Sequence, residues 1–296
     1  DIFNDIERQL KLNEYTDFNQ FSESVLALNK TNSLKATLEL GLRAASIGQS
    51  FAAGYRCALQ SLWPKLNSKE WAALCVSETQ GNHPKKIITT VTEQGVLKGH
   101  KSFVSMAEQA EQLIIIAKAG ENNDRPILKA VLVSQSQAGV ETKAMPNIGM
   151  LPDINHGSIE LNNAEGIVLP GDGHADFSRR FRYLEDVHLL MAFVALILSK
   201  SLRNNLDSEI VEKCLVLVTS IITLNKQDSH WQHLHLSGLF REFEGLALNF
   251  EAAIEEMKGD FYQNWMGDKK IFSIASRART SRTEKARTNL REKVTY

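Results

Sequence analysis

The chain has 296 residues, long enough for one large domain or for two to three packed subdomains with an extensive core. Its 34 Lys and Arg residues almost cancel its 35 Asp and Glu residues, so its overall charge does not steer it toward nucleic acid or an anionic membrane. The three cysteines are far apart in apolar stretches, which is typical of reduced, buried thiols in a cytoplasmic protein.

Two further sequence patterns indicate whether the protein is secreted or inserted in a membrane. The first ten residues are acidic and polar, and they lack the basic and apolar regions of a secretory signal. The longest apolar run, residues 187–198, is much shorter than the ~20 residues needed to cross a bilayer. We therefore expect a buried core helix there and no membrane partner.

The N-terminal third has the apolar spacing of helices. Between residues 33 and 62, apolar side chains recur at steps of three and four residues, and a Trp-Pro pair ends the pattern. Gly41, Gly48 and Gly54 interrupt the pattern, which indicates that another element packs closely against this segment.

The middle of the chain, between about residues 71 and 168, changes to short runs rich in β-branched residues. Pieces such as T-Q-G-N-H-P and G-E-N-N-D-R-P separate these runs and are typical of turns. This pattern predicts a small β-domain inserted between helical regions.

Helical spacing returns at Asp176 and continues nearly to the end, with breaks where Asp or Ser can serve as N-caps. It predicts a four-helix bundle with helices at 176–204, 208–225, 229–258 and 261–292. The whole chain then divides into an N-terminal helical domain, a middle β-domain and a C-terminal helical bundle, at residues 1–70, 71–172 and 173–296.

Three segments resemble the acyl-CoA dehydrogenase family. C-V-S-E-T-Q-G-N-H-P at 75–84 is similar to the family's first barrel segment, and G-H-K-S-F-V-S at 99–105 is similar to its Gly-x-Lys-aromatic-x-Ser/Thr segment. G-I-V-L-P-G-D-G-H at 166–174, leading into Y-L-E-D-V-H-L-L-M-A at 183–192, resembles the passage from barrel to first bundle helix. The resemblance implies an α+β fold with N-terminal helices, a middle β-barrel-like domain and a C-terminal four-helix bundle.

The resemblance also implies a flavin cofactor, FAD. In the family, the two barrel segments lie beside the isoalloxazine ring, and hydrogen bonds to that ring tune its affinity for hydride. By position, Val76, Ser77, Phe103 and Ser105 would contact the ring. The alternative is that Ser77 and Ser105 are ordinary strand hydroxyls and that Phe103 belongs to the core.

The implied reaction is the α,β-dehydrogenation of an acyl-CoA or another acyl thioester, which needs a base for the α-proton. Some family members carry this base on the first bundle helix, where Glu185 lies in this chain. Glu185 would lie at the mouth of an apolar helix face, where desolvation raises the pKa of a carboxyl toward neutrality. Asp186 is the second candidate, and a network of Glu185 with Arg182 and His188 is the alternative without chemistry.

Three segments typical of the family have no counterpart. Asn82-His83-Pro84 replaces a Gly-Ser-Asp, no Arg-x-x-Phe-Gly follows the first bundle helix, and a Gly-Gly-x-Gly-Tyr segment is missing. These departures support a second hypothesis, in which the chain is a non-catalytic ligand- or partner-binding protein that has lost FAD and the base. We expect a homodimer or a dimer of dimers, because the helices between 176 and 224 are apolar on more than one face.

Two side-chain clusters complete the candidates. His230, His233 and His235 do not have the spacing of a metal site, and no carboxylate completes a coordination shell, so we expect a helix cap or a surface cluster. The C-terminal tail is strongly basic and forms either a solvated helix or a positive face that holds phosphates of CoA or FAD, or an acidic partner. The side chains of that face are Arg279, Arg282 and either Arg287 or Lys285.

Overall fold

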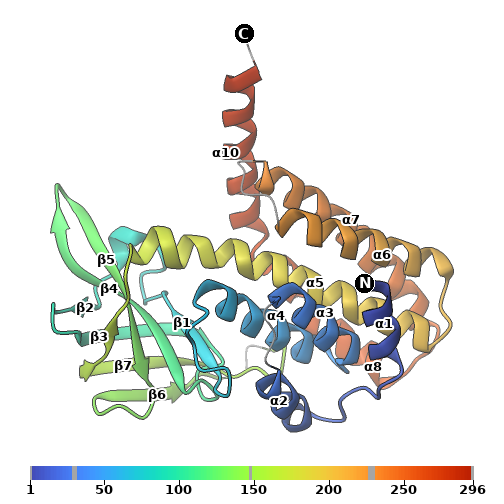
Figure 1. Ribbon diagram of the computed structural model, residues 1–296, viewed down its shortest axis with the longest axis horizontal. Coiled ribbons are helices and arrows are strands. Elements are labelled where there is room, and N and C mark those ends of the chain that lie inside the picture. The colour runs from blue at the N-terminus through green and yellow to red at the C-terminus, as the bar shows by residue number, and fades with distance from the viewer. Residues whose placement is uncertain (1, 29–31, 147–148, 226–230, 295–296) are drawn as a thin grey trace.

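The computed structural model describes residues 2–28, 32–146, 149–225 and 231–294 (Figure 1). A curled sheet lies at one end, and helices make up the rest of the molecule. The expected α+β class, with N-terminal helices, a β-barrel-like middle and C-terminal helices, is confirmed. The division into three domains, with boundaries at 70/71 and 172/173, stays a prediction. Among the described residues, no helix is both long and apolar enough to span a membrane.

Four helices precede the sheet. They are α1 (Ile2–Leu10), α2 (Phe18–Ala27), α3 (Ser33–Arg43) and α4 (Ile47–Leu62). Asp17, Asn32 and Ser46 are the N-caps of α2, α3 and α4, and each side chain accepts a backbone N–H three residues later. Extended backbone at Ala44 and at Ser46 divides the periodic stretch 33–62 into two helices.

The sheet has eight strands. They are β1 (Ala72–Cys75), β2 (Thr90–Val91), β3 (Val96–Ser105), β4 (Gln112–Asn122), β5 (Arg125–Ser134), β6 (Val140–Ala144), β7 (His156–Glu165) and β8 (Ile167–Val168). Their order is β6-β7-β3-β2-β4-β5-β8, and β1 pairs in parallel with β4. The antiparallel pair β3–β7 shifts register between Lys101 and Val104 and ends with Ser105 opposite His156.

The C-terminal region starts with a π-helical turn at Gly173–Arg179. The helices that follow are α5 (Arg180–Arg203), α6 (Ser208–Asn225), α7 (Gln232–Glu255), α8 (Asp260–Asp268), α9 (Ile271–Ile274) and α10 (Ser276–Val294). The single helix predicted at 261–292 is therefore wrong, because the chain turns twice there. The turns place the ring of Phe272 against those of Phe193 and Phe243, with centroids 4.9 and 5.1 Å apart.

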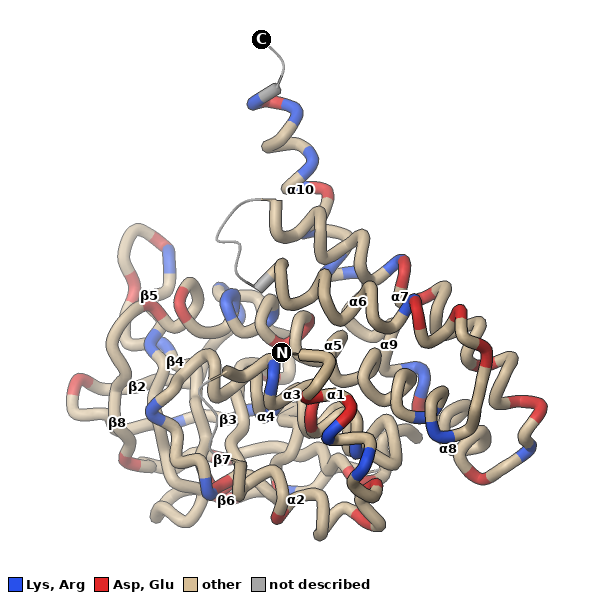
Figure 2. Tube along the Cα trace, turned by 45° about the vertical axis from the view of Figure 1, so that its right-hand side comes forward, with Lys and Arg blue, Asp and Glu red and all other residues tan. Residues whose placement is uncertain are grey.

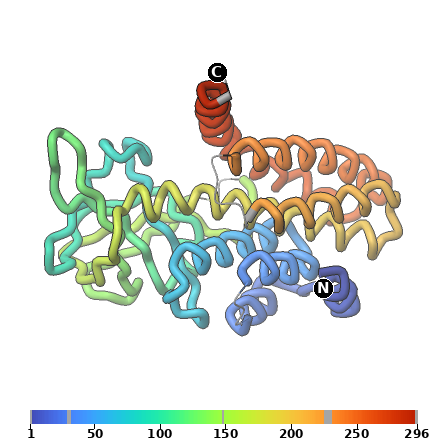
Figure 3. Tube along the Cα trace, turned by 45° about the horizontal axis from the view of Figure 1, so that its top comes forward, coloured from blue at the N-terminus to red at the C-terminus, as the bar shows by residue number. Residues whose placement is uncertain are grey.

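The central element is α5, which runs between the pair α3–α4 on one side and α6–α7 on the other (Figures 1 and 3). Most of its side chains are buried, and one hydrophobic core includes residues of both helical regions. The apolar faces of α5 are thus covered within the chain. They give no support to the expected homo-oligomer, which stays a prediction.

Two of the glycines predicted to allow close packing do so against α5. A Cβ on Gly41 would lie 2.8 Å from the Ala192 oxygen and from the Ala195 Cβ, and one on Gly54 would lie 2.9 Å from Leu189. These contacts are closer than side chains allow. Glycine therefore sets the distance between α5 and the helices α3 and α4.

We expect Gly54→Ala to lower the free energy of unfolding by about 1–3 kcal/mol, because its new methyl group meets the backbone of α5. Gly245→Ala on α7 is the matched control, since no atom lies within 4 Å of its added Cβ. The control should stabilise the protein by up to about 1 kcal/mol. Urea denaturation of both variants measures the difference, and equal effects would contradict the packing argument.

A candidate active site between the sheet and the helices

A cavity of about 170 Å³ lies where the ends of β3 and β7 meet the helices α4, α5, α7, α9 and α10. Its apolar wall is rich in phenyl rings, which are those of Phe51, Phe193, Phe240, Phe243 and Phe272. Its polar side chains are Ser105, His156, Glu185, Asp186 and Arg279. An apolar pocket with a few converging polar groups is the usual form of a small-molecule site.

Ser105 and His156 face each other across the ends of β3 and β7. The Ser105 Oγ lies 3.3 Å from the His156 Nε2, and the His156 Nδ1 lies 3.2 Å from the Ile154 carbonyl oxygen. A carbonyl oxygen only accepts, so Nδ1 carries the proton and Nε2 accepts from the Ser105 hydroxyl. Burial lowers the pKa of His156, which keeps the ring neutral at physiological pH. His156 was not predicted, because nothing in the local sequence distinguishes it.

Glu185 lies in the second turn of α5 and is half-buried at the cavity. Burial, together with the neighbouring Asp186, raises the pKa of its carboxyl to about 8, although Arg282 and Arg182 oppose the shift. No hydrogen bond or ion pair to Glu185 forms among the described residues. The carboxyl is therefore the group of this cavity best suited to accept a proton near neutral pH.

The alternative network around Glu185 does not form. His188 is buried on another face of α5, where its Nδ1 lies 2.7 Å from the Leu184 oxygen and its Nε2 lies 2.9 Å from the Ser33 Oγ. Arg182 acts on Glu185 only through its charge. The carboxylate is not held by the partners that the sequence suggested for a purely structural role.

Asp186 is buried and bound by two arginines of α10. Arg279 donates to its Oδ1 at 3.3 Å, and Arg282 donates to its Oδ2. Arg279 also donates to the Phe272 oxygen at 2.7 Å, and its guanidinium lies 4.0 Å from the centroid of the Phe240 ring. Asp186 thus attaches α10 to α5, and these contacts make it a poor candidate for the base.

The basic tail forms α10, which projects away from the other helices (Figure 3) and carries a series of Lys and Arg residues (Figure 2). Two arginines of its predicted positive face, Arg279 and Arg282, have their acidic partner, Asp186, within the chain. Arg287 pairs with Glu284 at 2.6 Å, and Lys285 is exposed.

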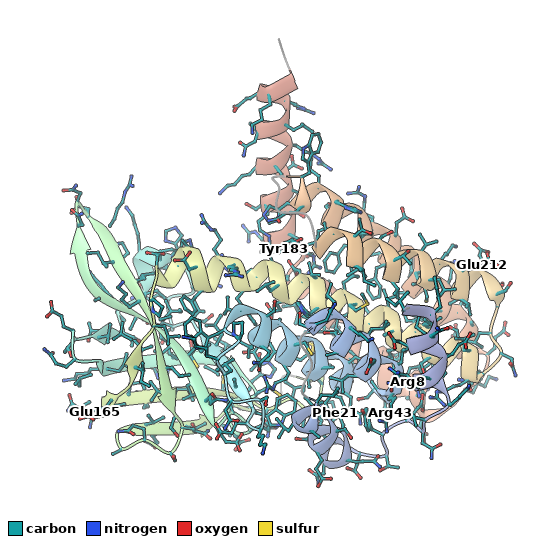
Figure 4. The ribbon with its side chains drawn as sticks, in the orientation of Figure 1. Arg8, Phe21, Arg43, Glu165, Tyr183 and Glu212 are labelled. Atoms are coloured by element: carbon teal, nitrogen blue, oxygen red, sulfur yellow. The ribbon has the colours of Figure 1, made fainter. Side chains whose placement is uncertain are left out.

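The first turns of α5 also meet α7 near the base of α10. Tyr183, labelled in Figure 4, packs its ring edge-to-face against His233, with centroids 5.7 Å apart. His233 is thus accounted for by packing, and His230 lies outside the described residues. No group of side chains suited to a metal ion occurs in the part of the chain that the structure describes.

A buried ion pair joins the two barrel segments. Lys101 Nζ lies 2.6 Å from Glu78 Oε1, and both side chains are almost fully buried. Lys101 also donates to the Val76 oxygen, and Glu78 accepts the backbone N–H groups of Ile88 and Thr89. The sequence contained both residues within the quoted segments, but nothing in their spacing indicated that they pair.

This ion pair places the remaining predicted residues side by side. The Ser102 N–H donates to the Ser77 oxygen at 2.9 Å, so the segment after β1 runs beside β3. Phe103 sits at the register shift of β3 with φ of 53°, and its side chain is 63% exposed. Phe103 is therefore not a core residue, which the sequence left open as the alternative to a contact with the flavin ring. Val76, Ser77 and Phe103 do not line the cavity that contains Ser105 and Glu185.

No model of a known protein family matches the sequence, and no curated protein matches it. Solved structures do match. PigA, solved with FAD and proline, is 14% identical with a TM-score of 0.70 over 98% of this chain and 96% of that chain. Butyryl-CoA dehydrogenase from Megasphaera elsdenii is 12% identical with a TM-score of 0.70 over 95% and 92% of the two chains.

An acyl-CoA dehydrogenase from Geobacillus kaustophilus is similar at 13% identity, with a TM-score of 0.63 over 86% of this chain and 81% of that chain. At these identities the likeness is one of fold. The chain has the fold of the acyl-CoA dehydrogenases, as its three sequence segments predicted.

Proposed function

We propose that the protein is a flavin-dependent oxidoreductase of the acyl-CoA dehydrogenase type that removes hydrogen from the α and β carbons of an acyl thioester. The observation that carries this proposal is the carboxyl of Glu185, with a pKa of about 8, in the same apolar cavity as Ser105. A base with a pKa near neutrality suits the removal of a weakly acidic proton.

The residues at the sheet fit the ring of FAD. Phe103 presents an exposed aromatic face at a bulge, and Ser77 lies on the neighbouring segment with a hydroxyl that makes no hydrogen bond to the described residues. Backbone groups of Val76 and the hydroxyl of Ser105 would add polar contacts. When bound, FAD supplies the acceptor for the hydride that leaves the β carbon.

In this reaction Glu185 takes the α-proton onto a carboxylate oxygen. The surrounding phenyl rings exclude water, which strengthens the electrostatic contacts inside the cavity and keeps the pKa of the carboxyl raised. The Ser105 hydroxyl donates a hydrogen bond to the His156 Nε2, so the Ser105 oxygen keeps its lone pairs for an incoming hydrogen-bond donor.

We expect the purified protein to show a flavin absorption band after incubation with excess FAD, and the band to bleach when an acyl-CoA is added without oxygen. The physical reason is that proton and hydride removal reduces the flavin. A series of acyl-CoA chain lengths would identify the substrate, since the fold does not select one. A colourless preparation that takes up no FAD would contradict the proposal.

One observation favours the second candidate, a non-catalytic binding protein that has lost FAD. The cavity of about 170 Å³ is smaller than the ~300–1,000 Å³ typical of ligand pockets. The same experiment decides between the two functions, because stoichiometric FAD that is reduced by an acyl-CoA excludes a non-catalytic role. A homodimer or a dimer of dimers is compatible with both proposed functions. If the protein forms one, light scattering will give at least twice the chain mass of 33.1 kDa.

A further inference from the structure

A second, larger cavity lies among the N-terminal helices and shares no lining residue with the candidate active site. It measures about 460 Å³ and is bounded by α2, α3, α4 and the loop that follows α4. Figure 4 labels Phe21 on α2 and Arg43 at the end of α3, two of the helices that bound it. A volume of this size falls within the range of ~300–1,000 Å³ in which small molecules bind.

Arg56 of α4 lines this cavity and is itself only 5% exposed. A guanidinium has five N–H donors, and two of those of Arg56 have acceptors, the Gln60 Oε1 at 2.8 Å and the Asn67 oxygen at 3.4 Å. The Nε has no hydrogen-bond partner in the described part of the chain. More than half of the donors of a buried cation are thus unused.

No carboxylate of the described residues forms an ion pair with Arg56. Glu111 acts on it only through its charge, and the Glu111 carboxylate accepts the backbone N–H of Trp71 instead. A buried charge is costly unless it is paired and hydrogen-bonded. Arg56 therefore has both the charge and the unused donors to pair with an anion at this cavity.

The rest of the lining is two-sided. On the α2–α3 side the lining is apolar at Val25, Leu28, Ala36 and Leu40, and its one polar side chain among the described residues, that of Ser33, already lies 2.9 Å from the His188 Nε2. On the side of α4 and its loop, Arg56 is accompanied by the polar residues Gln60, Ser61 and Ser68. A planar carboxylate matches the fork of a guanidinium in a bidentate manner. The apolar side suits a hydrocarbon body.

We propose that this cavity, which we name the Arg56 pocket after its lining by Arg56, Gln60, Ser61 and Ser68, binds a monocarboxylate with an apolar chain. The carboxylate pairs with the guanidinium of Arg56, and the chain lies against α2 and α3. The site is separate from the flavin chemistry proposed above and does not depend on it.

Octanoate is a suitable probe, with octan-1-ol as the neutral analogue of equal length and inorganic phosphate as a different anion. Titration calorimetry of the purified chain should show one molecule of octanoate bound and at least tenfold weaker binding of octan-1-ol. Saturating octanoate should also raise the melting temperature, because a ligand of the folded state stabilises it. Equal affinity for the acid and the alcohol would refute the role of the guanidinium, and displacement by phosphate would refute the carboxylate.

Two variants and two controls locate the site. Arg56→Gln should weaken octanoate binding at least tenfold, and Ser61→Phe should block it by filling the cavity from α4 while every charge is kept. Arg125→Gln, which removes the same charge from the exposed first residue of β5, should bind as the wild type does. Glu185→Gln should also leave binding unchanged, which separates this pocket from the active site. Unchanged binding in a folded Ser61→Phe variant would overturn the proposal even where Arg56→Gln folds poorly.

Discussion

In a Glu185→Gln variant that retains its flavin, reduction of the flavin by an acyl-CoA should fall by ~10²–10⁴-fold or more. The amide keeps the size and packing of the side chain, but it cannot accept the α-proton. Stopped-flow absorbance at the flavin band measures the rate directly. Glu165→Gln is the matched control, because Glu165 is exposed at the far end of the sheet (Figure 4) and should not affect the rate.

If the Glu185→Gln variant kept the wild-type rate, Asp186 could not be the base in its place. Asp186, the second candidate from the sequence, is bound by Arg279 and Arg282, so it is not free to act in place of Glu185. A wild-type rate would therefore contradict the proposed chemistry at this cavity rather than transfer it to the neighbouring carboxylate.

The same variant has a second readout in its stability. Burial raises the pKa of Glu185 from the ordinary 4.5 to about 8, so protonated Glu185 favours the folded state. This stabilising contribution is complete below pH 4.5 and is lost as the pH rises through about 8. The unfolding free energy of the Gln variant minus that of wild type should therefore increase by on the order of 1–3 kcal/mol when the pH is raised from about 5 to about 9. Denaturation of both proteins at the two pH values checks the sign.

The largest expected loss of stability follows from Lys101→Met, at about 3–5 kcal/mol. The change leaves Glu78 buried without its cation, and burial alone would raise the pKa of that carboxyl, whereas Lys101 lowers it. Lys143→Met is the control, because its pair with Glu141 is exposed and should contribute at most about 1 kcal/mol. Urea denaturation measures both.

A double variant tests whether charge is the cause. Adding Glu78→Gln to Lys101→Met removes the uncompensated carboxylate, so the pair of changes should cost less than Lys101→Met alone. The wild-type ion pair should also weaken in acid, since the lowered pKa of Glu78 gives stability that is present above its ordinary pKa and is lost as the pH falls. An additive loss in the double variant would mean that lost packing, not charge, dominates.

Local spacing in the sequence predicted the fold and part of the site. The order of helices and strands follows from periodicity and caps, and the cavity brings together Ser105 and Glu185, which the sequence proposed separately. Their roles as flavin contact and base stay predictions. Phe103 is exposed because the pairing of β3 with β7 contains a bulge at this position. Such a bulge depends on both strands, so the sequence of β3 alone does not predict it.

The features that the sequence did not predict all depend on contacts between distant residues. The pair of Asp186 with Arg279 joins residues 93 positions apart, and His156 reaches Ser105 only through strand pairing. The break within the predicted last helix places Phe272 against Phe193, a tertiary contact that overrides helical spacing. No local pattern contains such information.

The glycine contacts of α5 fix the rotational phase of this helix as well as its distance. Each residue of an α-helix turns the side-chain direction by about 100°, so Glu185 points about 40° away from Leu189, the residue that rests on Gly54. Inserting a single residue between Glu185 and Leu189 would turn the carboxyl by about 100°, away from the cavity, while the glycines hold the rest of α5 in place. The direction in which the Glu185 carboxyl points is therefore set by the absence of a side chain at Gly41 and at Gly54, which lie on α3 and α4.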